Sequence, residues 1–212
     1  MTTSDLEAHM RGTAAPVLLA LALLTGVAGC GSPSSDGTDP ATSSPPTTQT
    51  SEPSPSTPEA SGPPFPADTR ADDGGQGSGN GLGVTGVRVA RQDGFDRVVF
   101  DLDGTGTPGW RVEYTAEPTS EGSGEPVAIE GEVFLQVVLR GVGMPFETGI
   151  EPFGDADTRV PGTGTTGVAE VAPGAVYEGE QQAFIGLTGT QRPFRVFALT
   201  DPVRVVVDVR DE

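Results

Sequence analysis

The sequence contains no lysine, and its only cysteine and only histidine, Cys30 and His9, lie within the first thirty of its 212 residues. The rest of the chain therefore lacks the side chains that form Ser-His-Asp and Cys-His catalytic groups, lysine Schiff bases, thiolate or imidazole zinc sites and disulfides. All 12 cationic side chains are arginines, against 30 acidic ones, and the net charge is −18. This balance argues against nucleic-acid binding through a basic face.

The N-terminal part of the chain predicts that the protein is exported from the cytoplasm. Residues 12–29 hold a short apolar run with the length of a signal-peptide core. The stretch VAGC at residues 27–30 looks like a bacterial lipobox, in which the cysteine is diacylated and the chain is cut just before it. We therefore predict a lipoprotein signal peptide over residues 1–29 and lipidation at Cys30, which would anchor the protein on the extracytoplasmic face of the cell membrane. A plain secretory signal with an incidental cysteine is the alternative.

The segment after the lipobox predicts a tether. Residues 30–83 consist largely of Ser, Thr, Pro and Gly, with Phe65 and Leu82 as the only large apolar side chains. A segment of this composition buries too little apolar surface to offset the entropy of ordering it. We expect it to be disordered and to lift a folded domain from the membrane into the cell wall or periplasm.

From residue 84 to residue 212, short runs of alternating apolar and polar residues recur between Gly, Pro and Asp turns. Clear examples are residues 97–102, 133–140 and 204–209. Period-two alternation is typical of strands with one buried face, and no window keeps a helical period for more than about two turns. The pattern predicts an all-β domain, an antiparallel β-sandwich, over residues 84–212.

An internal repeat refines this architecture. Residues 86–102 align without gaps on residues 193–209. The identical pairs are Arg88 and Arg195, Val89 and Val196, Arg97 and Arg204, Val98 and Val205, Val99 and Val206, and Asp101 and Asp208. Both copies read strand, turn, strand, so we predict two equivalent hairpins related by a pseudo-twofold axis. Chance likeness between two strand pairs rich in Arg and Val is the alternative, because β composition is narrow.

The register of the first hairpin follows from which side chains share the core face. In an antiparallel pair, directly opposite residues lie on the same face of the sheet. The valines at 87 and 89 therefore share a face with the apolar residues at 98, 100 and 102 only if the numbers of opposite residues add up to an odd value. A sum of 189 puts Gly94 and Phe95 in a two-residue turn with glycine first. We therefore predict that register.

The same register makes a prediction about charged side chains. It places Arg88 directly opposite Asp101 across the strands, and by the repeat it places Arg195 opposite Asp208. The second turn contains Pro202 at a position that common turns disfavour, so we expect that turn to be longer or irregular.

Four sequence blocks resemble a known family. They read GVRVARxDGFDRVVFDL, PGWRVEY, YEGEQQAFIGL and PFRVFALTDPVRVVVDV, and together they extend over most of residues 84–210. These blocks look like the AMIN-like domain of actinobacterial lipoproteins, which is related to the AMIN domain found beside cell-wall amidases and in secretins. The resemblance implies a non-catalytic β-sandwich of two related sheets that localises proteins in the envelope by binding peptidoglycan. No catalytic domain follows the sandwich here, so the resemblance leaves open what would be localised.

Candidate ligand-binding residues come from the repeated hairpins and from the strand after a Gly/Thr/Pro loop. They are Arg88, Arg97, Asp101, Arg195, Arg204 and Asp208 from the hairpins, and Trp110, Arg111 and Tyr114 from that strand. One interpretation is a polar strip that hydrogen-bonds a glycan or a stem peptide, with aromatic faces stacking on sugar rings. The other is exposed cross-strand ion pairs, each contributing under about 1 kcal/mol, and aromatic rings packed in the core.

These observations predict a non-catalytic, lipid-anchored envelope protein whose sandwich binds peptidoglycan or another wall component. Residues 84–212 carry 10 Arg and 21 acidic residues, so acidic wall polymers would be repelled at long range, and binding requires neutral contacts or a local arginine patch. The alternative is a protein-interaction module of an envelope complex. A glycosidase with two carboxylates and a calcium site at Asp155 and Asp157 are weaker hypotheses, because no motif accompanies them. No cofactor is predicted.

Overall fold

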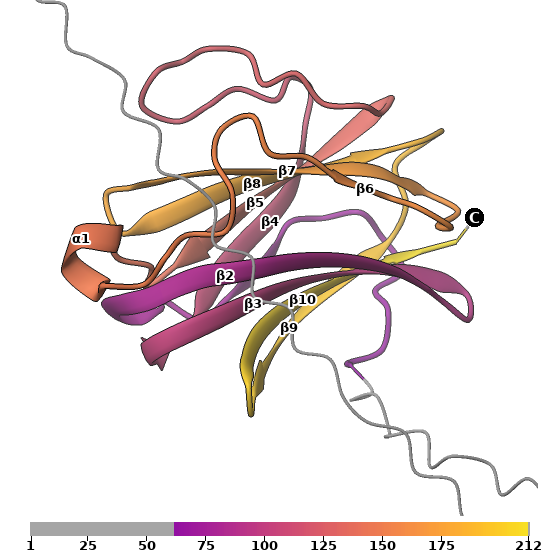
Figure 1. The fold of residues 1–212 in the computed structure, drawn as a ribbon. Helices are drawn as coiled ribbons and strands as arrows, with labels where there is room; N and C mark the ends of the chain where they lie inside the picture. The colour runs from indigo at the N-terminus through magenta and orange to yellow at the C-terminus, as the bar shows by residue number, and fades with distance from the viewer. Residues whose placement is uncertain (1–61, 212) are drawn as a thin grey trace, which may run out of the picture. The chain divides into compact units, whose positions relative to one another are not determined.

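The computed structural model describes residues 62–211, which form two antiparallel sheets packed face to face (Figure 1). The predicted all-β sandwich is therefore confirmed. The predicted signal peptide, the lipidation site Cys30 and most of the predicted tether lie outside the described residues. Within residues 62–211, no helix is long and apolar enough to cross a membrane.

The larger sheet has six strands. In spatial order these are β1 (Asp72–Gly74), β4 (Gly109–Thr115), β5 (Val133–Arg140), β8 (Glu180–Leu187), β7 (Val168–Tyr177) and β6 (Val160–Pro161). Every neighbouring pair is antiparallel. Within this sheet the shortest loop joins β7 to β8 and consists of Glu178 and Gly179, which both have positive φ, as in a type I′ hairpin turn.

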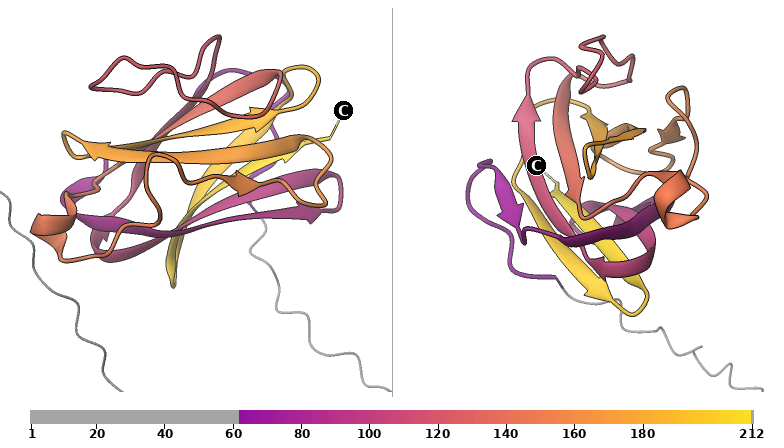
Figure 2. Two further views of the ribbon diagram at one scale, coloured as in Figure 1. Left: turned by 45° about the horizontal axis from the view of Figure 1, so that its top comes forward. Right: turned by 90° about the vertical axis from the view of Figure 1, so that its left-hand side faces the viewer.

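The smaller sheet has four strands and contains the whole internal repeat. In spatial order these are β2 (Ser78–Gln92), β3 (Phe95–Thr107), β10 (Val203–Arg210) and β9 (Phe194–Thr200). The two views of Figure 2 show this sheet lying across the larger one. The only helix among the described residues is a single turn, α1 (Pro145–Thr148), in the connection between β5 and β6.

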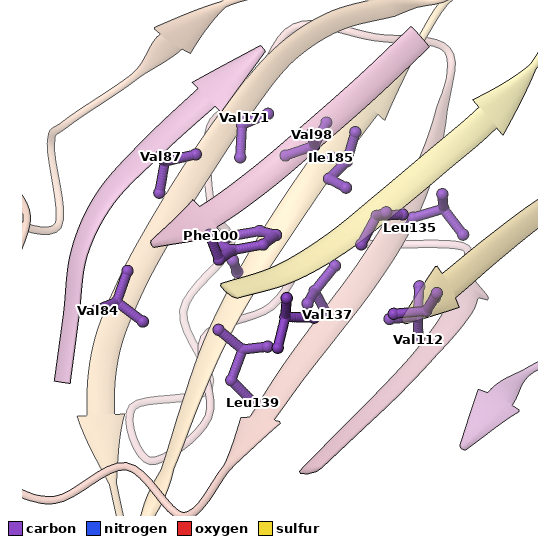
Figure 3. Close-up of a cluster of buried hydrophobic side chains, with 14 of the residues drawn as sticks. Val84, Val87, Val98, Phe100, Val112, Leu135, Val137, Leu139, Val171 and Ile185 are labelled. Carbon is purple, nitrogen blue, oxygen red and sulfur yellow. The ribbon is translucent and has the colours of Figure 1, made fainter. Parts of the chain in front are cut away.

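The core lies between the two sheets and follows directly from the period-two alternation. Figure 3 shows how apolar side chains from both sheets meet there, among them Val98 and Phe100 of β3 and Leu135 and Val137 of β5. All four are at most 1% exposed. Burying one such side chain contributes roughly 1.5–3 kcal/mol, so the two sheets hold each other through this layer.

The repeated hairpins lie side by side in the four-stranded sheet. Strands β3 and β10 pair along its centre, with Arg97 opposite Asp208 and Asp101 opposite Arg204. The alignment of the repeat exchanges these two pairs and brings Val99 of β3 opposite its own equivalent, Val206 of β10. A pseudo-twofold axis through that central pair therefore relates the two hairpins, as the repeat predicts.

The register of the first hairpin differs from the prediction by two residues. Gln92 pairs with Phe95, so the turn consists of Asp93 and Gly94 rather than Gly94 and Phe95. Gly94 has φ 85°, a left-handed conformation that glycine adopts at little steric cost, which explains why it takes the second turn position. Because the sum of paired numbers stays odd, the predicted core face of β2 and β3 is nevertheless correct.

The second hairpin has the predicted register but not the predicted turn. Arg195 pairs with Asp208, and Thr200 pairs with Val203. The turn is therefore only two residues long, Asp201 and Pro202, and the peptide bond between them is cis. The expectation of a longer or irregular turn is therefore wrong, because strand pairing continues up to Thr200 and Val203 and leaves only these two residues between the strands.

The predicted boundary at residue 84 is too late. The glycine-rich stretch that we assigned to the tether contains β1 and the start of β2, and Leu82 is fully buried. Composition alone misses this pairing because it depends on close backbone contact. A Cβ on Gly104 would lie 2.0 Å from the carbonyl oxygen of Gly81 across the hairpin, so glycine is required here.

Candidate functional site

Three of the predicted strip residues form an ion cluster on the outer face of the four-stranded sheet. The Arg97 guanidinium contacts the Asp208 carboxylate with nitrogen–oxygen distances of 2.7 and 3.0 Å, and Arg195 Nε donates to the same carboxylate at 2.8 Å. The side chains of Arg97 and Asp208 are only 5% and 0% exposed. The prediction of solvent-exposed ion pairs is therefore wrong for this cluster, which we call the covered triad.

The covered triad is shielded by residues 62–65, a segment that we assigned to the tether and now call the strap. The Phe65 ring centroid lies 4.3 Å from the Arg195 guanidinium carbon, and the Phe65 ring packs at 5.6 Å against Phe95. The Pro63 carbonyl accepts a hydrogen bond from Arg195. A Cβ on Gly62 would meet the Phe197 ring at 2.3 Å, so the strap lies flat on that ring.

The remaining strip residues form the equivalent of this cluster on the other side of the pseudo-twofold axis. Arg88 donates two hydrogen bonds of 2.8 Å to the Asp101 carboxylate, although the two residues are not directly opposite. Arg204 lies opposite Asp101, and its Nε donates to the Pro202 carbonyl. The side chains of Arg88 and Asp101 are 59% and 28% exposed. We call Arg88, Asp101 and Arg204 the open triad.

The two candidate aromatic residues belong to the packing of the sandwich. Trp110 of β4 donates its ring N–H to the Asp72 carboxylate at 2.9 Å, and that carboxylate also accepts the backbone N–H of Val196 on β9. The Tyr114 hydroxyl donates to the carbonyl of Arg192 and accepts the N–H of the same residue. Burial raises the pKa of Tyr114. Both rings tie the sheets together, and neither is presented as a stacking surface.

Arg111 does not join the other candidates, because it points away from the core on the six-stranded sheet. Its guanidinium pairs with Glu113 at 2.8 Å and with Asp73 at 3.6 Å. Arg140 donates to Asp73 as well and, as the largest cause, lowers the pKa of that carboxyl group. The nine candidate residues are therefore divided among four places: the covered triad, the open triad, the core edge and this exposed charge cluster.

A cluster that the sequence reasoning missed lies at the end of the sandwich where β10 finishes. Two adjoining hollows of about 460 Å³ each share Arg192 and Asp211. Arg91, from the end of β2, lines one hollow, and Arg210, from the end of β10, lines the other. Arg91 and Arg192, from distant parts of the chain, thus line the same hollow. No local motif could have shown this, because the β-topology alone brings them together.

Below this end, the buried carboxylate of Asp96 holds the loop before β7. It accepts backbone N–H groups from Thr166, Gly167 and Val168 at 2.6 to 3.1 Å. Arg91 lies 3.5 Å from the same carboxylate. Since its lone pairs are directed at the backbone, Asp96 acts as the anchor of the loop and of Arg91.

Two smaller hollows adjoin β7 of the six-stranded sheet, and one of them also adjoins α1. One, of about 210 Å³, is lined mainly by apolar groups, including Met144, Pro152 and Phe153. Next to it, Phe146 of α1 is 80% exposed. Its chain neighbour Pro145 lines the hollow, so an exposed apolar ring directly follows an apolar hollow in the chain.

The weaker metal hypothesis receives no support from the described residues. The carboxylate of Asp155 accepts hydrogen bonds from the Thr158 hydroxyl and the Asp157 N–H, so it closes its own loop. The bond from Thr158 is also the main cause that lowers the pKa of Asp155. No group of three or more potential ligands gathers within residues 62–211.

With the geometry described, comparison with known proteins identifies the family. The model of the AMIN-like domain matches residues 82–211, which is more than half of the chain and nearly the whole sandwich. No curated protein and no solved structure matches the chain. The match agrees with the sequence blocks of the two hairpins, of β4 and of β8, which all lie within it. The chain belongs to the AMIN-like domain family.

Proposed function

We propose that this protein is a non-catalytic, lipid-anchored component of the cell envelope whose sandwich binds peptidoglycan or another wall component. The observation that carries the proposal is the family match over residues 82–211, since AMIN-like domains are binding modules associated with the envelope. The proposal concerns binding by the folded surface and needs no reaction chemistry.

The charges of the sandwich restrict how it would bind. Residues 84–212 carry 10 Arg and 21 acidic residues, so wall polymers with carboxylate or phosphate groups are repelled at a distance. Most arginines of the sheets also have a carboxylate partner, as in the two triads. Binding therefore relies on short-range contacts at a particular place, and it should depend little on long-range attraction.

The test is co-sedimentation with purified sacculi. The chain from residue 30 onward, carrying Cys30→Ser so that it stays free of lipid, would be mixed with sacculi and spun down. We expect retention in the pellet well above that of an unrelated protein of the same net charge. Retention no higher than this control would overturn the proposal. A fragment beginning at residue 84 is unsuitable, because it lacks β1 and the start of β2.

The anchor has its own test. In cells, the wild-type chain should label with palmitate and fractionate with membranes, whereas Cys30→Ser should do neither. Labelling that persists in the variant would contradict lipidation at Cys30. Stable attachment depends on the acyl chains at Cys30. A Cys30→Ser variant that stays partly in the membrane fraction would therefore also count against the proposed anchor.

A protein-interaction module is the second candidate, and Phe146 is the observation that favours it. Its ring is 80% exposed, and the two preceding residues, Met144 and Pro145, line the apolar hollow. A photo-crosslinking residue at position 146 should then form one dominant adduct in cells, whereas the same group at the exposed Arg70 should not. Equal adducts at both positions would exclude this surface as a docking site.

A further inference from the structure

The outer face of the four-stranded sheet carries a pair of aromatic side chains around one arginine. These are Phe95 of β3 and Phe197 of β9, and the Arg195 guanidinium carbon lies 5.1 and 5.9 Å from the centres of their rings. The repeat places Pro202 and Ala90 at the equivalent positions. The aromatic pair is therefore not a property of the repeat, and it is present on the side of the sheet that the strap covers.

The strap occupies this place with a proline-rich sequence. Together with Pro66 it reads GPPFP. Its one aromatic ring, that of Phe65, lies over the Arg195 guanidinium, and its backbone contributes the Pro63 carbonyl, which accepts a hydrogen bond from the same arginine. The backbone at Gly62 lies on a further aromatic ring. Surfaces lined with aromatic side chains recognise proline-rich peptides in this way, because proline fixes the peptide backbone before binding and lowers the entropy cost.

The strap is attached to the sandwich without being part of a sheet. Its residues belong to no strand, and β1 begins only at Asp72. Pro63, Pro64 and Pro66 have no backbone N–H, so these residues donate no backbone hydrogen bond to the sheet. All three are exposed. The strap is therefore held by one ring and a few short contacts, and we expect it to open in a small fraction of the molecules while the strands stay paired.

Opening of the strap would uncover a surface that is already arranged for a ligand. Phe95 and Phe197 are partly buried with the strap in place, and both rings would lose part of this cover. Arg195 would keep its 2.8 Å bond to the Asp208 carboxylate, so its guanidinium would stay in position. A fixed cation between two aromatic rings can receive another ring on its face and a carbonyl oxygen at its edge. These are the two groups that the strap provides.

We infer that this face is a docking site for a partner protein with a proline-rich segment that contains an aromatic residue, and that the strap is the internal occupant which this segment displaces. The partner's ring stacks on the Arg195 guanidinium, and a carbonyl of its backbone accepts a bond from the same side chain, as the strap does. A second copy of this chain is disfavoured as the partner, because residues 84–212 carry 10 Arg and 21 acidic residues and two such domains repel each other. The inference is independent of wall binding.

The first experiment measures, by fluorescence anisotropy, the binding of a labelled peptide with the sequence of residues 60–70. The parent protein is the chain from residue 30 carrying Cys30→Ser. Because its strap must open first, the parent should bind the peptide at least about tenfold more weakly than the same chain with Phe65→Ala. Arg70→Gln, close to the strap in sequence, should bind like the parent. Equal affinities of the parent and Phe65→Ala would show that strap and peptide do not share a site. Binding by Phe65→Ala but never by the parent would show that the strap does not exchange, and either result would overturn the inference.

Substitutions in the peptide test the recognition without disturbing the folded chain. A peptide with Phe65→Tyr should bind the Phe65→Ala protein like the original peptide, whereas a peptide with Phe65→Leu should bind at least about fivefold more weakly, because leucine has no ring to stack on the guanidinium. Equal binding of the leucine peptide would contradict the site. On the protein, Arg195→Gln should weaken binding, and Arg88→Gln, its equivalent in the repeat, should not. Thermal unfolding checks that both protein variants are folded.

Two further readouts separate this inference from its alternatives. In sedimentation equilibrium the parent should be a monomer at all concentrations tested. A dimer that disappears with Phe65→Ala would assign the face to a second copy of the chain and overturn the partner proposed here. Retention on sacculi is an independent readout: its absence in the parent would reject wall binding, whereas absence of peptide binding by Phe65→Ala would reject the docking site alone.

Discussion

The covered triad and the open triad consist of equivalent residues of the internal repeat, yet their environments differ. Each consists of two arginines and one aspartate, and the repeat relates them residue by residue. In the covered triad both arginines bond the buried carboxylate of Asp208. In the open triad only Arg88 bonds Asp101, and both remain accessible to water.

The strap is what distinguishes the two triads. Phe65 and Pro63 cover Arg195, and no equivalent segment among the described residues covers Arg88. Burying an ion pair costs free energy, because both charges lose their hydration. It also raises the penalty when one partner is lost, because the other charge is then buried without a partner. The covered triad has therefore become part of the folded interior, whereas the equivalent open triad stays a surface feature that contributes little to stability.

The largest expected effect comes from removing the shared carboxylate on each side. Asp208→Ala leaves Arg97 buried without its carboxylate and should lower the free energy of unfolding by about 3–5 kcal/mol. The matched variant Asp101→Ala should lower it by less than about 1 kcal/mol. Urea denaturation of both variants tests the contrast, and similar losses would show that the two triads are energetically equivalent.

Removing the strap contact should have a smaller effect. Phe65→Ala removes the apolar ring and its contact with the Arg195 guanidinium, so we expect the free energy of unfolding to fall by about 1.5–2 kcal/mol. Phe146→Ala, in which an 80% exposed ring is removed, is the control and should change stability by less than about 0.5 kcal/mol. A loss of stability at Phe65 no larger than at Phe146 would show that the strap does not stabilise the domain.

The two hairpins differ in their turns, and the turn of the first hairpin offers a third test. Gly94 has φ 85°, and a Cβ there would meet no atom within 4 Å. Gly94→Ala should therefore cost about 1 kcal/mol through backbone conformation alone. The neighbouring substitution Asp93→Ala should cost less. Thermal unfolding of the two variants measures the difference, and an equal effect would argue against the observed turn.

The smallest effect concerns salt. A double-mutant cycle on Arg88 and Asp101 should give a coupling energy below about 1 kcal/mol that shrinks as ionic strength rises. The coupling between Arg97 and Asp208 should be larger and nearly independent of salt, because water and ions do not reach it. Equal salt dependence in both cycles would contradict the burial of the covered triad.

The sequence predicted those parts of the fold that depend on local pattern. Alternation predicted the strands and their core faces, and the repeat predicted the two equivalent hairpins and the partnership of Arg195 with Asp208. The register of β2 was wrong because it rested on the choice of turn. At Asp93 and Gly94, the glycine conformation decided that choice.

The features that were missed depend on contacts between distant segments. Polar, glycine-rich composition predicted disorder for residues 72–83, yet backbone contact at Gly81 orders the start of β2. Phe65 was the one available signal for the strap, as an isolated aromatic residue in a polar segment. The contact between Arg91 and Asp211 had no signal, because the two residues are separated by most of the domain in sequence and meet only in the folded structure.

The most direct test of the account is amide hydrogen exchange of the chain from residue 30, with and without soluble muropeptides released by a muramidase. We predict slower exchange in the loops of residues 164–168 and 188–193, which contribute to the hollow lined by Arg91 and Arg192, and unchanged exchange around the covered triad. Protection confined to the open triad, or no protection anywhere in the sandwich, would contradict it.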